Sequence, residues 1–75
     1  MMIAYRSHRY DCRHGDVLEG PVYSFTQRAT AEWYRKRYMD GQGTIIKIDG
    51  VNPRTHKDHP DQRIFDEATI LQILE

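Results

Sequence analysis

The stretch PVYSFTQRATAEWYRKRYMDGQGTIIKIDG, residues 21–50, decides the fold of this chain. Its first part alternates, so that Val22 and Ser24 fall on one side of an extended backbone and Tyr23 and Phe25 on the other. A helical pattern follows, and β-branched residues dominate the last part. We therefore predict a strand over 22–26, a helix from residue 27 and a strand over 44–48.

The predicted helix has a recognisable start and a recognisable inner face. Thr26 is expected to be its N-cap, because a hydroxyl there can accept a hydrogen bond from a free backbone amide. Ala31, Tyr34 and Tyr38 recur at the spacing of one buried helical face. Trp33 is expected to widen that face.

The segments on either side are expected to complete a small sheet. A short apolar run predicts a strand over 2–5, with Arg6 leaving its end. Residues 7–20 and 54–62 are polar and predict long loops. The β-branched content of 68–74 favours a closing strand. The predicted fold class is α+β, a small and mostly antiparallel sheet packed with one main helix and joined by long polar loops.

Length and charge restrict the classes of function. Seventy-five residues predict a single domain, 1–75. The chain carries 11 basic and 11 acidic residues, so no whole-molecule field attracts nucleic acid. Nucleic acid is therefore not expected as the main partner. Small size and the exposed edges of so small a sheet favour a protein partner, and the same edges would also allow a homodimer. No apolar run resembles a signal peptide or a membrane span, which predicts a cytoplasmic location.

Four short motifs then occur in a defined order. They are Tyr5-Arg6, the Ser-Phe-Thr of 24–26, the Ala-Glu-Trp-Tyr of 31–34 and the Gly-Thr-Ile-Ile-Lys-Ile of 43–48. In this order they resemble the ADP-ribosyltransferase superfamily, in the branch named for its Arg, Ser-Thr-Ser and Glu-x-Glu motifs. The resemblance covers most of the chain.

The resemblance implies roles for three residues. Arg6 would support the phosphates or ribose of NAD, which suits a planar guanidinium. Ser24 would belong to the hydroxyl motif that braces the nicotinamide pocket, and Tyr34 would hold the aromatic position of the helix. The residues alone leave alternatives open, since Arg6 also fits a surface arginine and Ser24 an ordinary strand residue.

The catalytic motif of that family is incomplete in this chain. Glu67 falls on the first Glu of the late strand, whereas Thr69 stands at the second, essential one. A neutral hydroxyl cannot replace a negative charge that stabilises the developing cation on the ribose. Shifting the register by two makes Glu67 the catalytic residue but places Phe65 at the first Glu. The favoured interpretation is a degenerate site.

These observations predict a non-catalytic ADP-ribosyltransferase-like binding module that needs no cofactor. It would act as an inhibitor or accessory protein on a macromolecular partner, as a phage or mobile-element protein acts on a host defence complex. The alternative is an active mono-ADP-ribosyltransferase that uses NAD, with Glu67 as its catalytic carboxylate.

Two further groups of side chains suggest binding. Imidazole and thiol ligands suit zinc, and a zinc-stapled binding domain is a second alternative, although the spacings match no standard finger. Its candidate ligands are His8, Cys12, His14, His56 and His59. A basic helix surface formed by Arg28, Arg35 and Lys36 is a candidate partner surface, and a solvated helix face is the alternative.

Overall fold

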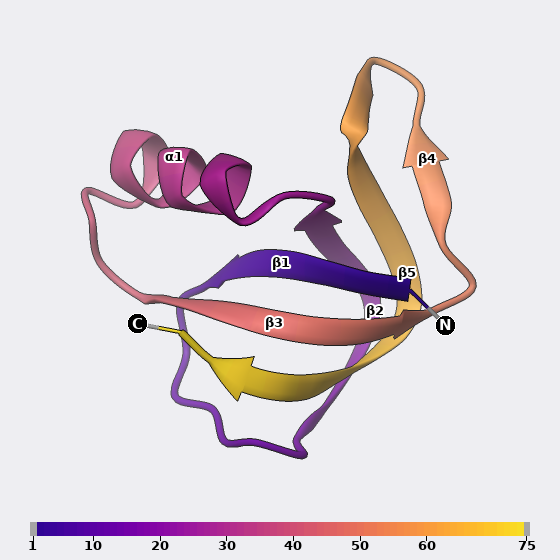
Figure 1. The fold of residues 1–75 in the computed structure, drawn as a ribbon, viewed down its shortest axis with the longest axis horizontal. Helices are drawn as coiled ribbons and strands as arrows, with labels where there is room; N and C mark the ends of the chain where they lie inside the picture. Colours follow the sequence, from indigo (N-terminus) through magenta and orange to yellow (C-terminus); the bar gives the residue numbers. More distant parts are fainter. Residues whose placement is uncertain (1, 75) are drawn as a thin grey trace.

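A computed structural model of the protein describes residues 2–74 and shows five strands and one helix (Figure 1). The elements in chain order are β1 (Met2–His8), β2 (Val17–Phe25), α1 (Arg28–Tyr38), β3 (Thr44–Val51), β4 (Arg54–His56) and β5 (His59–Ile73). All strand pairs are antiparallel. The predicted α+β class is confirmed.

The sheet closes on itself. Its strand order is β2-β1-β3-β5-β4, and an additional pairing joins β2 to β5. Four strands therefore form a ring, while β4 pairs with β5 and extends as a hairpin away from it (Figure 1). The length of β5, 15 residues, lets it pair with β2 along one edge and with β3 and β4 along the other.

The weakest join of this ring lies between β1 and β2. Every residue of β1 pairs with β3, from Met2 opposite Gly50 to His8 opposite Thr44. By contrast, the β1–β2 ladder consists of Tyr5 opposite Phe25. Beyond that pair the two strands separate, and we call this opening the seam.

One hydrophobic cluster fills the interior of the ring. Its buried members are Ala4, Val22, Ile46, Ile48, Phe65, Ala68 and Ile70. They come from four strands, as period-two alternation of inward-facing residues requires. A Cβ atom on Gly50 would overlap the ring of Phe65, so the absence of a side chain there lets β3 approach β5 closely.

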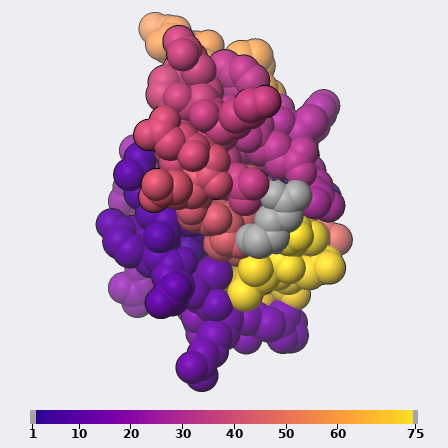
Figure 2. Space-filling model, turned by 90° about the vertical axis from the view of Figure 1, so that its left-hand side faces the viewer, coloured from indigo at the N-terminus to yellow at the C-terminus, as the bar shows by residue number. Residues whose placement is uncertain are grey.

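The helix lies against β1, with further contacts to β3 and β2. Ala31 is its one fully buried residue among those described, and the Ser7 hydroxyl donates a hydrogen bond to the Ala31 carbonyl. Figure 2 shows the side on which α1 and the turn after it lie above the N-terminal segment. Gly43, with φ of 79°, brings that turn close to the carbonyl of His8.

Two details of the predicted helix are wrong. Gln27, not Thr26, is the N-cap, and it makes no side-chain capping bond. The backbone amide of Thr26 instead donates to the Asp61 carbonyl, which keeps Thr26 in the extended segment. Trp33 and Tyr38 do not belong to a buried face, since they are 56% and 57% exposed. Only the narrow side of α1 around Ala31 meets the sheet.

The strands also extend further than predicted, and the loops are correspondingly shorter. Arg6 lies inside β1 and not at its end, because β1 continues to His8. β2 begins at Val17, and β4 and β5 occupy most of 54–62. The first part of β5 is largely exposed, so its residues are polar on both faces and show no alternation that would predict a strand. The closing strand over 68–74 is confirmed as far as Ile73.

Candidate functional site

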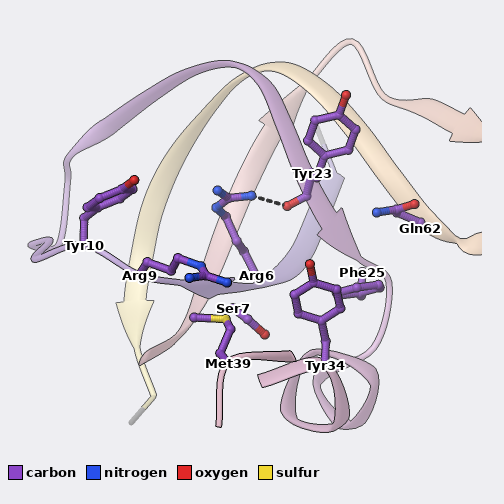
Figure 3. A pocket seen from close by; sticks show the side chains of 9 residues that line it. All are labelled: Arg6, Ser7, Arg9, Tyr10, Tyr23, Phe25, Tyr34, Met39 and Gln62. Atoms are coloured by element: carbon purple, nitrogen blue, oxygen red, sulfur yellow. Dashed lines mark hydrogen bonds between the residues drawn. The ribbon is translucent and has the colours of Figure 1, made fainter. Parts of the chain in front are cut away.

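The seam is held together by an arginine side chain. Arg6 pairs through its backbone with Ile46 of β3, and its side chain extends to β2. There its Nη1 donates a hydrogen bond of 2.6 Å to the carbonyl of Tyr23 (Figure 3). This bond links β1 to the backbone of β2 beyond the single Tyr5–Phe25 pair of their ladder.

A buried histidine fixes the same guanidinium from the other side. Arg6 Nε donates to Nδ1 of His8 at 3.2 Å, so Nδ1 must be unprotonated. His8 is only 6% exposed. Burial, and secondarily the charge of Arg6, lower the pKa of His8, so the neutral imidazole that accepts this bond is favoured.

A cavity of about 420 Å³ opens at the seam, a size typical of small-molecule sites. Its lining residues are Arg6, Ser7, Arg9, Tyr10, Tyr23, Phe25, Tyr34, Met39 and Gln62. Figure 3 shows these side chains around the opening, contributed by β1, the loop after it, β2, α1, the residue that caps α1 and β5. We call it the seam cavity.

Electrostatically, the seam cavity favours anions. The residues of 2–74 that line it include two arginines and no Asp or Glu. Burial lowers the pKa of Arg6, and the phenols of Tyr34 and Tyr10 oppose that shift. An arginine nevertheless keeps its charge in proteins. Within the described residues, neither Arg6 nor Arg9 forms an ion pair, so their charges remain available to a ligand.

A second cavity, of about 290 Å³, adjoins the first and shares Phe25, Tyr34 and Gln62 with it. Four aromatic rings line it, each packed against the next. Phe25 and Tyr34 have ring centroids 5.5 Å apart, Tyr34 and Tyr38 4.9 Å, and Tyr38 and Trp33 5.8 Å. We call this set the aromatic row. It extends the seam cavity across the exposed side of α1.

The structure brings together two of the four site residues expected from the resemblance. Arg6 and Tyr34 both line the seam cavity. Ser24 is fully buried and donates its hydroxyl to the Arg63 carbonyl at 3.1 Å. Alternation along β2 turns it away from Tyr23 and Phe25, which face the cavity.

Glu67 lies apart from these residues. It sits on β5 opposite Glu19 of β2 and Val51 of β3, is exposed, and lines none of the cavities described for residues 2–74. Ser24, by contrast, pairs with Arg63, further toward the start of β5. Arg6, Ser24 and Glu67 therefore do not converge on one cleft.

The candidate zinc ligands are dispersed. His8 accepts a hydrogen bond from Arg6, and Cys12 lines a cavity beside His8. His56 and His59 lie on the β4–β5 hairpin with ring centroids 4.8 Å apart, and His14 is exposed in the loop after β1. Among residues 2–74, no three His, Cys, Asp or Glu side chains group closely enough to hold a metal ion.

The basic helix surface is partly neutralised within the chain. Arg28 pairs with Glu32 at 3.0 Å, four residues later on the helix. Arg35 is half-buried, and Lys36 is exposed. Arg37 lies over the ring of Tyr38, 5.8 Å from its centroid.

Several residues of the cavity were not anticipated from the sequence. Arg9 and Tyr10 fall in a segment without periodicity, and Gln62 comes from a segment interpreted as a loop. Tyr23 had one indication, because its alternation with Ser24 places it on the outer face of β2. The closing of the sheet into a ring, which no local pattern encodes, brings these four residues together.

Fold and site thus define a class: a small antiparallel α+β domain with a basic, aromatic cavity at an open seam of its sheet. No protein-family model, curated protein or solved structure matches the chain at a significant level. Within residues 2–74, α1 is too short and too polar to cross a membrane.

Proposed function

We propose that the protein is a non-catalytic binding module that holds a nucleotide in the seam cavity. The observation that carries this proposal is the pairing of Arg6 and Arg9 with aromatic side chains in a cavity whose described lining includes no carboxylate. Guanidinium groups bind phosphate oxygens through paired N–H donors. Aromatic faces stack on nucleobases. A phosphate joined to a base satisfies both.

The position of Glu67 supports a binding role over catalysis. Cleavage of the nicotinamide bond develops positive charge on the ribose, which a fixed carboxylate must stabilise. The seam cavity offers none, and Glu67 is exposed elsewhere on β5. The residues present therefore suit retention of a nucleotide better than transfer of ADP-ribose from NAD.

In this role the module would act as an inhibitor or accessory protein, in the cytoplasm, on a macromolecular partner that presents the nucleotide. The resemblance to ADP-ribosyltransferases supports nucleotide chemistry at Arg6 and Tyr34. A phage or mobile-element protein directed against a host defence complex is the biological setting that fits so small a binder.

The test is calorimetric titration with AMP, with adenosine and with pyrophosphate. AMP is expected to bind more tightly than either of the other two, because each lacks one of the two recognised parts. Arg9→Gln removes a charge that forms no hydrogen bond or ion pair among residues 2–74, and it is expected to weaken AMP binding about tenfold or more. Arg13→Gln, in the same loop but outside the cavity, is the matched control. Equal AMP affinity in both variants, or no AMP binding, would overturn the proposal.

The active-transferase alternative has its own test. Labelled NAD incubated with the protein is expected to stay intact. Release of nicotinamide that disappears in Glu67→Gln would show that Glu67 is catalytic after all.

A further inference from the structure

The seam cavity does not end as a closed pocket. It continues into the second cavity through the shared residues Phe25, Tyr34 and Gln62. A single mononucleotide would occupy the basic part and leave the adjoining aromatic part uncovered. The combined opening therefore fits an extended ligand that carries another aromatic group beside the phosphate.

The aromatic row is unusually exposed for its composition. Trp33 and Tyr38 are 56% and 57% exposed, although burial of either ring would stabilise the fold. The contacts between neighbouring rings hold them in place along α1. Rings held in this way present faces for stacking at low entropic cost.

Charge is arranged along the same path. Arg6 and Arg9 mark one end, and Arg37 lies over Tyr38 within the aromatic row. Asp61 lines the aromatic cavity, and no acidic residue lines the basic one among the described positions. Although the net charge of the chain is zero, the end of the cavity at Arg6 and Arg9 is locally positive. This arrangement suits a ligand that alternates phosphates with aromatic bases.

An amide lies where the two cavities meet. The side chain of Gln62 makes no hydrogen bond to any residue within 2–74. It offers both a donor and an acceptor, which matches a ribose 2′-hydroxyl. This feature favours RNA over DNA.

We infer that the seam cavity and the aromatic row together bind single-stranded RNA, with a phosphate between Arg6 and Arg9 and the neighbouring base stacked on the row. This inference rests on the proposed nucleotide site and names its ligand class. It departs from the sequence-based expectation of a protein partner.

The experiment uses Trp33, the only tryptophan, as reporter. The protein is titrated with an unlabelled single-stranded RNA of about ten adenylates, a length within the range that small binding folds occupy. Stacking is expected to quench the fluorescence. The RNA is expected to bind at least about fivefold more tightly than AMP, because one further stacked base contributes on the order of 1–3 kcal/mol. DNA of the same sequence is expected to bind more weakly, and RNA duplex not to quench.

Two variants separate the parts of the site. Tyr38→Leu keeps the reporter and is expected to weaken RNA binding about five- to 150-fold and to weaken AMP binding much less, because AMP reaches the row only through Tyr34. Gln62→Leu is expected to abolish the preference for RNA over DNA. Val17→Ala removes an exposed apolar side chain that lines neither cavity and is the control.

The outcomes are distinguishable. AMP binding that depends on Arg9, together with RNA that binds no more tightly than AMP or ignores Tyr38→Leu, would overturn the RNA inference and leave the nucleotide site standing. Equal affinity for DNA would overturn the RNA assignment. Failure of both AMP and RNA to bind would remove both proposals.

Discussion

His8 couples the seam to pH. Burial and the Arg6 charge lower its pKa in the folded protein below the ordinary value of 6.5. At pH values between the pKa of His8 in the folded protein and its pKa in the unfolded chain, the unfolded chain therefore binds a proton more readily. Stability from this group is fully present above about pH 6.5 and is lost as pH falls toward the folded pKa.

We predict that the free energy of unfolding in urea falls between about pH 7 and about pH 5. His8→Asn, whose carbonyl can still accept from Arg6, should flatten this slope. His14→Asn, at an exposed site, should leave it as in the parent protein. A slope unchanged in His8→Asn would contradict the assignment. Asp66, whose pKa is lowered by hydrogen bonds from Arg54 and Asn52, acts at lower pH and does not interfere.

Cys12 is predicted to be a slow nucleophile. Burial raises the pKa of its thiol, and the charges of Asp16 and Asp11 raise it further. Less thiolate is therefore present at neutral pH. Alkylation by iodoacetamide, followed by mass spectrometry, should run several-fold slower in the native protein than after unfolding. Asp11→Asn should accelerate the native reaction, and equal rates in native and unfolded protein would refute the prediction.

At the scale of elements, the contact between β3 and β5 depends on a missing side chain. Gly50→Ala would force a methyl group into the Phe65 ring. We predict a loss of about 1–3 kcal/mol in the free energy of unfolding, measured by urea denaturation. Gly41→Ala meets open space and carries only the strain of its φ of 73°, so it should cost about 1 kcal/mol or less. An equal or larger loss in Gly41→Ala would show that the β3–β5 contact is loose.

The elements themselves were largely predictable from local pattern. The β-branched run around Ile46 predicted β3, and the alternation around Ser24 predicted the end of β2, because both patterns are visible in the local sequence. The exposed first part of β5 was not predictable, since polar residues on both faces leave no alternation. The exposure of Trp33 was also missed, because helical spacing shows which residues share a face and not whether a partner covers it.

At the scale of the whole molecule, the site arises from closure of the sheet. Arg6 was identified as a candidate through its motif, but Arg9, Tyr10 and Gln62 join it only because β1, β2 and β5 belong to one ring. Pairings between residues distant in sequence depend on the complete fold. The same closure separates Glu67 from Arg6, a separation that the order of the motifs along the chain could not decide.

The balanced charge of the molecule predicts a shallow salt dependence. If Arg6 and Arg9 neutralise two phosphates, the logarithm of the RNA association constant should fall against the logarithm of salt concentration with a slope of about −1.4. Fluorescence titrations at several salt concentrations measure this slope. A much steeper slope would mean that the RNA is bound by a broader basic surface, such as that of α1.

The most direct measurement is a map of backbone amide chemical shifts on addition of AMP. A nucleotide site in the seam should shift the amides of Arg6, Arg9, Tyr10 and Tyr23 and leave that of Glu67 unmoved. Shifts centred on Glu67 and its neighbours in β5, or no shifts at saturating AMP, would contradict it.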